Sequence, residues 1–315
     1  MRDEKRLVII IPCYNEEETV EYSADKLIKK IESLINSAII SPDSGICFVN
    51  DGSTDKTYEI LNNLADKNKR IAIINLSRNF GQQYALLAGM KTVTADIIIT
   101  LDADLQDSID VIDEMINKYH EGCEIVYGCR QKRDGDTFLK KFTAESFYKI
   151  MKFFCPKIYY NHADYRLMSR KALNLLNEYR EKSVFLRGLI PHIGLNSGIV
   201  YYDRAARVYG KTKYNYSKML EFAWQGITDY STFPIRLISL TGICLMGTSL
   251  LLIITLLSYY LKTKTIYTAF LLISFMSLFS GLILLSIGII GEYIAKILYE
   301  TKNRPQFQIE STKNL

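Results

Sequence analysis

The chain has 315 residues and a formal net charge of +5, a mildly basic balance that gives no indication of a nucleic-acid partner. Its six cysteines form no Cys-x-x-Cys pair, and it contains only three histidines. This composition argues against a zinc site and a disulfide scaffold, and it is typical of a reducing compartment. The apolar run near the N-terminus is too short for a signal peptide.

Apolar runs rich in β-branched residues alternate with amphipathic segments in the N-terminal part of the chain. Strands are predicted at 7–11, 46–49, 71–76, 97–101 and 124–127. Helices are predicted at 20–35, 84–90 and 109–119, where apolar residues recur every three or four positions. Strands that alternate with helices indicate an α/β fold with a doubly wound sheet.

Two carboxylates one residue apart, Asp102 and Asp104, follow the strand predicted at 97–101. Ligands of α/β sheets bind just outside the carboxyl ends of the strands. Two carboxylates this close repel each other unless a cation lies between them or one is protonated. We therefore predict a hard divalent ion, Mg²⁺ or Mn²⁺, held by these carboxylates and by substrate phosphates. The alternative interpretation is a solvated acidic loop.

Polar sequences also follow the second and third predicted strands, at 50–55 and 77–81. Three polar strand ends at one sheet edge favour a nucleotide site. The fingerprint Gly-x-Gly-x-x-Gly is absent after the first strand, which disfavours a nicotinamide enzyme. The motif Gly-x-x-x-x-Gly-Lys-Ser/Thr is absent as well, which disfavours an NTPase of that type.

The composition changes after Arg236, because 237–261 and 265–291 contain no charged residue. A bilayer core needs about 20 apolar residues per helix, so a hairpin of two transmembrane helices is predicted at about 236–260 and 266–290. Basic residues flank both ends of the hairpin, which places these ends on the cytoplasmic side. Small residues within the spans would allow close helix packing and a homo-oligomer: Gly242, Gly247, Gly281 and Gly288.

The predicted domains follow from these boundaries. Residues 1–215 form a cytoplasmic catalytic domain, and 216–234 form an interfacial amphipathic helix that contains Trp224. Residues 235–291 hold the two transmembrane helices, and 292–315 are a cytoplasmic C-terminal tail. The protein is thus expected in the inner (plasma) membrane. A chain that ends near Tyr230 is expected to retain nucleotide binding, because the predicted nucleotide site lies wholly within the α/β domain.

Four motifs in order resemble those of family 2 glycosyltransferases: Ile-Pro-Cys-Tyr-Asn-Glu-Glu at 11–17, Asn-Asp-Gly-Ser-Thr-Asp at 50–55, Leu-Ser-Arg-Asn-Phe-Gly at 76–81 and Leu-Asp-Ala-Asp-Leu-Gln-Asp at 101–107. The chain is most similar to the polyisoprenyl-phosphate group, which includes bactoprenol glucosyltransferases and dolichyl-phosphate mannosyltransferases. The resemblance extends over nearly the whole chain and implies a GT-A-type doubly wound domain followed by the transmembrane hairpin. One departure is Asn50, where many members have Asp.

The resemblance also implies roles for individual residues. The nucleotide-binding residues would be Pro12, Tyr14, Glu16, Asp51, Arg78 and Asp102. The metal ligands would be Asp102, Asp104 and Gln106. The acceptor phosphate would be held by Arg130, Arg133, Arg204, Arg207 and Lys213. The residues expected to act in catalysis are Asp104, Asp164, Arg130 and Arg133. Asp164 would orient the acceptor, and the alternative for it is a structural salt bridge to Arg166.

The predicted function is inverting transfer of one sugar from a nucleotide sugar, such as UDP-glucose, to polyprenyl (undecaprenyl) phosphate for modification of a cell-envelope glycan. Alternatives are an enzyme of the dolichyl-phosphate mannose synthase type that uses GDP-mannose, a processive polysaccharide synthase, and a non-catalytic receptor for nucleotide sugars. The Gln-x-x-Arg-Trp motif typical of the synthases is absent at Trp224. Asp102, Asp104 and the arginines argue against the receptor. The sugar itself rests on pocket contacts that the motifs do not encode.

Overall fold

The computed structural model describes residues 4–133, 162–179, 181, 185–204, 258, 261, 269–302 and 304–315. The chain divides into two compact units. The first unit contains Met1–Met219 together with Arg304–Leu315, and the second contains Leu220–Asn303. The C-terminal residues therefore belong to the same unit as the N-terminal ones.

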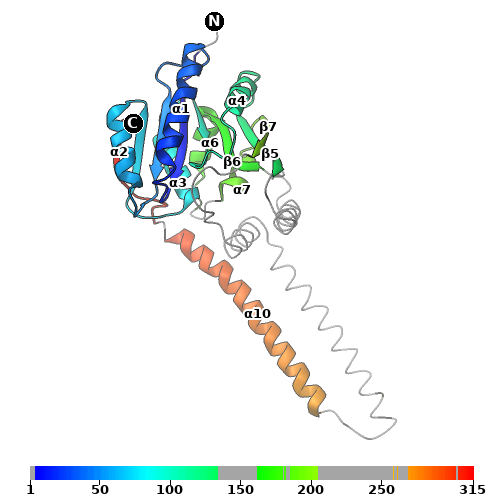
Figure 1. The fold of residues 1–315 in the computed structure, drawn as a ribbon. Coiled ribbons are helices and arrows are strands. Elements are labelled where there is room, and N and C mark those ends of the chain that lie inside the picture. Colours follow the sequence, from blue (N-terminus) through cyan, green and yellow to red (C-terminus); the bar gives the residue numbers. More distant parts are fainter. Residues whose placement is uncertain are drawn as a thin grey trace. The chain divides into compact units, whose positions relative to one another are not determined.

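The first unit alternates strands and helices along the chain (Figure 1). Its elements are β1 Leu7–Cys13, α1 Val20–Asn36, β2 Gly45–Asn50, α2 Thr57–Lys67, β3 Ile71–Leu76, α3 Gln82–Thr92, β4 Ile97–Thr100, α4 Val111–His120, β5 Ile125–Arg133, β6 His162–Ser169, α6 Arg170–Glu178, α7 Leu186–His192, β7 Ser197–Arg204 and β8 Ile309–Lys313. All five predicted strands and all three predicted helices are present. The strand predicted at 124–127 is β5, which continues to Arg133.

The eight strands form one mixed sheet in the order β7-β5-β6-β4-β1-β2-β3-β8. The central strands β4, β1, β2 and β3 are parallel. β6 lies between β4 and β5 and is antiparallel to both, and β8 is antiparallel to β3. The expected α/β fold is confirmed as a GT-A-like mixed sheet, with the central parallel strands bordered by antiparallel ones.

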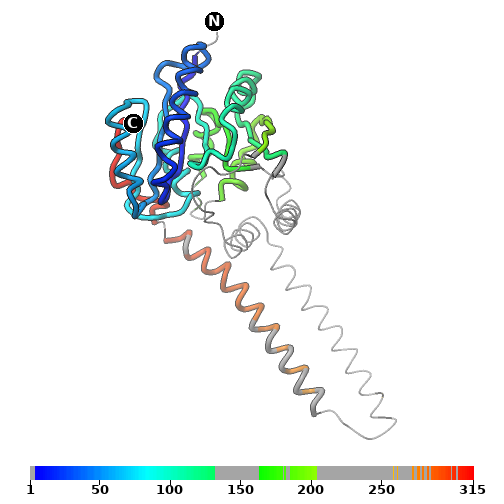
Figure 2. Tube along the Cα trace, in the orientation of Figure 1, coloured from blue at the N-terminus to red at the C-terminus, as the bar shows by residue number. Residues whose placement is uncertain are grey.

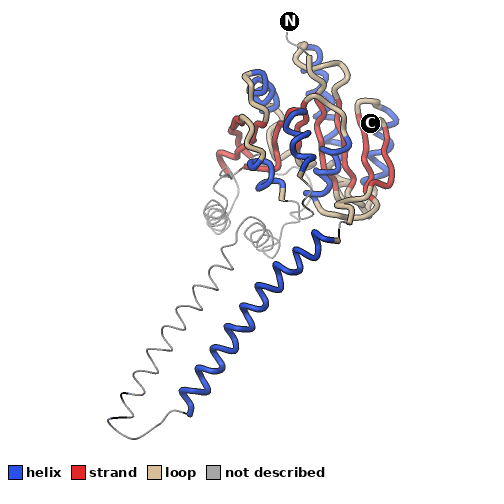
Figure 3. The backbone as a smooth tube through the Cα atoms, turned by 180° about the vertical axis from the view of Figure 1, so that it is seen from behind, coloured by secondary structure: helices blue, strands red, loops and turns tan. Residues whose placement is uncertain are grey.

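Helices cover both faces of the sheet, as Figure 3 shows from behind. The α1, α2 and α4 helices pack on one face, where Ile9 and Ile11 of β1 belong to the core. The α3, α6 and α7 helices pack on the other, where Val8 and Ile10 of the same strand are buried. Because the side chains of a strand alternate between faces, a strand buried on both sides must be apolar at every position. This explains the unbroken apolar run of β1.

The C-terminal segment is a strand of this sheet. Residues Ile309–Lys313, within the predicted tail 292–315, form β8 along β3. Figure 2 shows the red C-terminal segment beside the cyan segment that holds α2 and β3. Lys313 Nζ lies 2.8 Å from the carboxylate of Asp66 in α2, and Tyr58 and Ser311 hydroxyls lie 3.1 Å apart. The α/β domain is therefore built from both ends of the chain.

The second unit contains the helix α10, Ala269–Thr301, which covers most of the predicted span 266–290 and continues beyond it. Several of its large apolar side chains are exposed: Leu272, Met276, Ile283, Leu285, Ile287, Ile290, Ile294, Ile297 and Leu298. The predicted interfacial helix 216–234 and the span 236–260 fall outside the described residues, apart from Ser258. Within the described part of the chain, no helix combines the length and apolar character required of a membrane span. The predicted hairpin is thus not confirmed and stays a prediction.

Candidate active site

The loop after β4 carries the predicted metal ligands. Asp102 and Asp104 are both partly buried, and the Oδ1 atom of Asp104 accepts a hydrogen bond from the Gln106 backbone N–H at 3.2 Å. Leu105, between Asp104 and Gln106, has a φ of 46°, a left-handed conformation that is rare for a branched side chain. Ser23 of α1 donates to the Ala103 carbonyl at 2.5 Å and fixes the loop from the other side. The turn holds both carboxylates at the carboxyl edge of the sheet.

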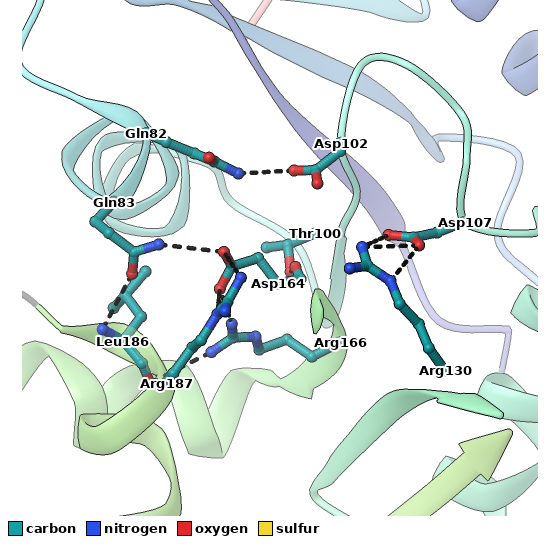
Figure 4. Close-up of polar contacts among 10 residues, drawn as sticks. All are labelled: Gln82, Gln83, Thr100, Asp102, Asp107, Arg130, Asp164, Arg166, Leu186 and Arg187. Carbon is teal, nitrogen blue, oxygen red and sulfur yellow. Dashed lines mark hydrogen bonds and ion pairs between the residues drawn. The ribbon is translucent and has the colours of Figure 1, made fainter. Parts of the chain in front are cut away.

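Asp102 lies among like charges. Its Oδ1 atom accepts a hydrogen bond from the neutral side-chain amide of Gln82 at 2.7 Å (Figure 4). Desolvation by the surrounding protein, and after it the negative charges of Asp107, Asp164 and Asp104, together raise the pKa of Asp102 to about 7. Removal of water and of compensating charge both disfavour the ionised form of a carboxyl group. A cation at this point would restore the carboxylate.

Asp107, the next carboxylate of the loop, is paired with an arginine. Arg130 of β5 donates from Nε and Nη2 to the two oxygens of Asp107 at 3.0 and 3.1 Å. Burial alone would lower the pKa of Arg130, but the charge and hydrogen bonds of Asp107 raise it well above its usual value. The two-pronged geometry is the strong form of this ion pair. Arg130 thus anchors the carboxylate loop to β5. If it also binds an acceptor phosphate, it does so while paired with Asp107.

The other expected acceptor residues are only partly described. Arg133 and Arg204 occupy matched register positions at the ends of the parallel strands β5 and β7. The structure therefore brings these two residues to one place, as the prediction requires. Arg207 and Lys213 fall outside the described residues. The acceptor role of all four residues stays a prediction.

Asp164 of β6 is held by two arginines. Arg166, completely buried, donates from Nη2 to Oδ1 at 2.6 Å. Arg187 of α7 donates from Nε to Oδ1 at 3.2 Å and from Nη2 to Oδ2 at 3.0 Å. The salt bridge between Asp164 and Arg166 that the sequence offered as an alternative is confirmed, and Arg187 is an addition. Figure 4 shows both guanidinium groups directed at the same carboxylate.

Two neighbouring glutamines at the start of α3 link the carboxylates. Gln82 donates to Asp102, as described above, and Gln83 donates to Oδ2 of Asp164 at 3.2 Å. The Oε1 atom of Gln83 accepts the backbone N–H of Leu186 at 3.1 Å, which ties α3 to the start of α7. One helix terminus therefore fixes the distance between the predicted metal loop and the Asp164 cluster.

Asp51 connects two loops at the nucleotide side. Its carboxylate accepts the backbone N–H groups of Phe80 and Gly81 at 2.7 and 2.9 Å. Burial raises the pKa of Asp51, and the two backbone N–H groups and the charge of Arg78 oppose this in part. The next residue, Gly52, has a φ of +62°, and a side chain there would overlap the backbone of Arg78. Asp51 therefore holds the loops after β2 and β3 together. Its contact with a nucleoside stays a prediction.

The remaining nucleotide-side residues lie at the same edge of the sheet. Pro12 is partly buried at the end of β1, and the ring of Tyr14 is 38 % exposed. Glu16 accepts a hydrogen bond from the Thr19 hydroxyl at 2.9 Å. The exposed Arg78 lies 4.0 Å from the centre of the Phe80 ring. The structure thus gathers all the predicted nucleotide-binding residues at the ends of β1, β2, β3 and β4.

The donor set fits a hard divalent cation that a substrate helps to bind. Within the described ranges, no three His, Cys, Asp or Glu side chains are grouped so that they alone would hold a metal. Asp102 and Asp104 supply two carboxylates, which suits Mg²⁺ or Mn²⁺ completed by phosphate oxygens and water. Burial and three neighbouring carboxylates raise the pKa of Asp102, so a cation bound here would stabilise its ionised form. Asp102, Asp104 and Gln106 would be the residues nearest to such an ion.

Sequence reasoning overlooked four residues of this site. Asp107 is the last residue of the motif at 101–107, and that position was the available signal. Gln82 and Gln83 directly follow the motif at 76–81, at the start of a predicted helix. Arg187 gave no local signal, because its partner Asp164 is 23 positions away in the chain.

Comparisons with known proteins show what the chain resembles. The model of the family "Glycosyl transferase family 2" matches residues 8–176. Uncharacterized glycosyltransferase YkoT of Bacillus subtilis is 45 % identical, with 96 % of this chain and 91 % of that protein covered. A bactoprenol glucosyl transferase of Shigella phage SfX is 36 % identical, with 98 % of this chain and 100 % of that protein covered. Mannosyl-3-phosphoglycerate synthase of Rubrobacter xylanophilus is a solved structure with a TM-score of 0.49 and 16 % identity, with 71 % of this chain and 73 % of that chain covered.

Proposed function

The chain belongs to glycosyl transferase family 2 and is a transferase enzyme, and from this premise we propose that it moves one sugar from a nucleotide sugar to a polyprenyl phosphate such as undecaprenyl phosphate. The proposal is supported by relatives named bactoprenol glucosyl transferase, which are 34–36 % identical over 98 % of the chain. UDP-glucose is the first donor to test because of these names. The lipid-linked product would supply a sugar for a cell-envelope glycan.

The single observation that carries the proposal is the division of charge at the carboxyl edge of the sheet. On the Asp102 side, burial and neighbouring carboxylates raise the pKa of Asp102, and this side lies beside the Asp51 loops. The Asp164 side is rich in arginine. A nucleoside diphosphate brings its own cation to the first side, and a phosphate monoester is attracted to the second.

Mg²⁺ or Mn²⁺, when bound, would neutralise the charge that develops on the departing nucleoside diphosphate. The residues of the chain do the positioning. Asp102 and Asp104 orient the donor diphosphate, and Gln82 holds the side chain of Asp102 in place at 2.7 Å. Asp51 keeps the loops after β2 and β3 together, so that the nucleoside meets a fixed surface that includes Tyr14.

The acceptor requires no strong general base. A phosphate monoester has a second pKa near ~6 and is largely a dianion at neutral pH. One of its oxygens forms a bond to the anomeric carbon while the bond from that carbon to the diphosphate breaks, and the electron pair leaves with the nucleoside diphosphate. A single displacement of this kind inverts the anomeric centre, so the reaction depends on alignment and charge stabilisation.

Arg187 is suited to contact the acceptor phosphate. Its side chain is 31 % exposed, whereas that of Arg166 is fully buried. Asp164 accepts two hydrogen bonds from Arg187 and thereby fixes the direction of its guanidinium group. Asp164 is a positioning residue in this scheme and accepts no proton. Arg133 and Arg204, paired in register in β5 and β7, stay candidates for the same role.

A membrane location at the inner (plasma) membrane completes the proposal. Its support is the lipid nature of the proposed acceptor, the two uncharged segments 237–261 and 265–291, and the exposed apolar side chains along α10. With both ends of such a hairpin on the cytoplasmic side, the α/β domain would meet the nucleotide sugar and the lipid phosphate together. Any homo-oligomer would form through the small residues of the spans.

The test is a turnover assay of the full-length protein in detergent or lipid. It is incubated with undecaprenyl phosphate, Mn²⁺ and a panel of radiolabelled UDP- and GDP-sugars, and the lipid fraction is analysed. One sugar per lipid from a single preferred donor is expected. A preference for GDP-mannose would indicate an enzyme of the dolichyl-phosphate mannose synthase type, long sugar chains would indicate a processive synthase, and the absence of transfer from every donor would contradict the proposal.

A further inference from the structure

A row of buried amide side chains connects the C-terminal strand with the loop after β2. Asn50, at the end of β2, donates from Nδ2 to the Oδ1 atom of Asn75 at 2.7 Å. Asn75, in β3, donates from Nδ2 to the Oε2 atom of Glu310 at 2.8 Å. The side chains of Asn50 and Asn75 are 2 % and 7 % exposed. A buried amide group destabilises the fold unless it forms hydrogen bonds. The hydrogen bonds of this row therefore hold these side chains in an ordered arrangement.

Glu310 sets the direction of the whole row. A carboxylate accepts hydrogen bonds and donates none, so Asn75 must present its NH₂ group to Glu310 and its carbonyl oxygen to Asn50. Asn50 must then donate to Asn75 and turn its own carbonyl oxygen away. That oxygen accepts the backbone N–H of Ser53 at 3.4 Å. One carboxylate on β8 therefore determines how an amide on β2 faces its loop.

The β8 strand is shaped so that Glu310 reaches this position. Asn75 pairs with Ser311 and Leu76 pairs with Ile309, so Glu310 is an extra residue at a shift in the register of β3 and β8. Such bulges redirect a side chain and occur frequently beside functional sites. The bulge directs the Glu310 carboxylate to the Asn75 amide and not into the regular ladder.

The loop at the other end of the row belongs to the proposed donor site. Ser53 also accepts the backbone N–H of Asn15 through its hydroxyl oxygen at 3.0 Å, which joins the loops after β1 and β2. Asn15 in turn accepts the backbone N–H of Thr54 at 2.8 Å. Asp51 and Tyr14 are the neighbours of these residues in the chain. A shift of Asn50 would therefore move the surface on which the nucleoside is proposed to lie.

We propose that Glu310 is a positioning residue for the donor nucleotide, and that it acts through Asn75 and Asn50 on the loop that carries Asp51. The inference rests on the proposed function, because it takes the Asp51 loop as the nucleoside site. It gives the residues after α10 a task in donor binding, although they are distant in the sequence from every donor motif. In contrast to the expectation from the sequence, it also predicts that a chain ending near Tyr230, which lacks β8, binds the donor poorly.

The row explains why asparagine suits position 50 in this chain. Aspartate at this position would require the NH₂ group of Asn75, and the turned Asn75 would then face Glu310 with its carbonyl oxygen. Two acceptors would meet, and the row would be interrupted. Glutamine at position 310 can donate to that oxygen, so it would restore a continuous row of opposite direction. Asn50 and Glu310 are thus predicted to be matched to each other.

The test measures nucleotide affinity by calorimetry on the full-length protein in detergent, with UDP and with GDP in the presence of Mn²⁺. Glu310→Ala is expected to raise the dissociation constant of the bound nucleotide about fivefold, and Asn50→Asp about tenfold. Glu310→Gln alone keeps an acceptor for Asn75 and should stay within about twofold of the wild type. The double variant Asn50→Asp with Glu310→Gln should also return to within about twofold, whereas Asn50→Asp with Glu310→Ala should not.

Lys313→Gln is the matched control on the same strand. Lys313 pairs with Asp66 and donates to the Asn62 carbonyl of α2, and it lies outside the row. Its replacement is expected to lower the melting temperature of the protein and to leave the nucleotide affinity and the KM of the lipid acceptor unchanged. A merely structural role for β8 would make affinity follow the melting temperature in all variants and would give no selective rescue by glutamine.

The outcomes separate the two proposals. If the wild type binds UDP or GDP but Glu310→Ala binds it equally well, or if glutamine fails to rescue Asn50→Asp, this inference is overturned and the proposed function stands. If the wild type binds neither nucleotide in Mn²⁺, the proposed function is overturned and the inference with it.

Discussion

The aspartates at the carboxyl edge of the sheet fall into two groups that differ in how their charge is balanced. Asp107 and Asp164 face arginines: Arg130 contacts the first, and Arg166 and Arg187 contact the second. Asp102 receives its hydrogen bond from the neutral amide of Gln82, and its pKa is raised to about 7. All three lie within one small region, so the difference reflects the choice of partners and not the depth of burial alone.

The charged partners of a carboxylate indicate whether it stabilises the fold or binds a ligand. A buried carboxylate that is paired with arginine is balanced by the protein itself and contributes little attraction for a further cation. A carboxylate that is crowded by like charges stays ionised only when a cation arrives from outside. We therefore propose that Asp107 and Asp164 hold the site together and that Asp102 and Asp104 bind a metal–diphosphate group.

The largest effect is expected on the balanced side, where Arg166→Met would leave Asp164 with a buried charge that has lost its closest partner. Removal of one member of a buried ion pair costs about 3–5 kcal/mol of unfolding free energy. Denaturant unfolding of the full-length protein measures this loss. The double variant Asp164→Asn with Arg166→Met removes both charges and should lose clearly less. A loss below about 1 kcal/mol for the single variant would contradict the assignment of Asp164 to the fold.

The next largest effect is expected on turnover, for a substitution in the group formed by Asp102 and Asp104. Asp104→Asn should reduce kcat on the order of 100-fold while the melting temperature stays near that of the wild type, because this carboxylate acts on the diphosphate. Chelation with EDTA should abolish activity, and Mg²⁺ or Mn²⁺ should restore it. Asp110→Asn, at an exposed aspartate of the same segment, is the control and should remain within about twofold. Full activity after exhaustive chelation would exclude the metal role.

A smaller effect, on acceptor binding, is expected for Arg187, which contacts Asp164 and is proposed to contact the acceptor phosphate. Arg187→Ala should raise the KM for the lipid acceptor about tenfold, because one charge-assisted contact to the phosphate is lost. Arg187→Lys should not restore it, since an ammonium group cannot make the paired contact with Asp164. Steady-state kinetics at saturating donor separates the two constants. An unchanged acceptor KM with a raised donor KM would move Arg187 to the donor site.

The smallest effect concerns stability and pH. The folded-state pKa of Asp102 is raised from 3.8 to about 7, so the metal-free fold binds a proton that the unfolded chain has released. This contribution is fully present below the lower value and is lost as the pH rises through the upper one. Asp102→Asn should therefore raise the melting temperature of the metal-free protein at pH 8 by about 2–4 °C and have less effect at pH 5. A lower melting temperature for Asp102→Asn at pH 8 would show that the protein itself compensates the negative charge of Asp102.

The sequence predicted where the residues of the proposed donor side lie, because the signals for these loops are local. Each donor motif directly follows an apolar strand, and parallel strands bring their carboxyl ends to one edge. The run 97–101 with Asp102 and Asp104 thus located both the strand and the proposed metal loop. The position of Pro12, Tyr14 and the Asp51 loop followed from the same rule.

The rest depends on contacts between distant parts of the chain. The strand β8 has no long apolar run, and only its pairing with β3 and the contacts of Lys313 with α2 make it a strand. β6 is inserted antiparallel between β4 and β5, which chain order does not reveal. Arg187 reaches Asp164 from α7, and Gln83 ties the start of α7 to α3. No local pattern of residues contains this information.

The most direct test of the account is the configuration of the product. The full-length enzyme is incubated with undecaprenyl phosphate, Mn²⁺ and the α-linked nucleotide sugar that it prefers, and the anomeric proton of the purified lipid product is examined by NMR. Alignment of a phosphate nucleophile opposite a metal-bound diphosphate predicts a β-linked polyprenyl-phosphate sugar. A product that retains the α configuration would contradict the single displacement, and with it the proposed placement of the donor diphosphate at Asp102 and Asp104 opposite the acceptor phosphate.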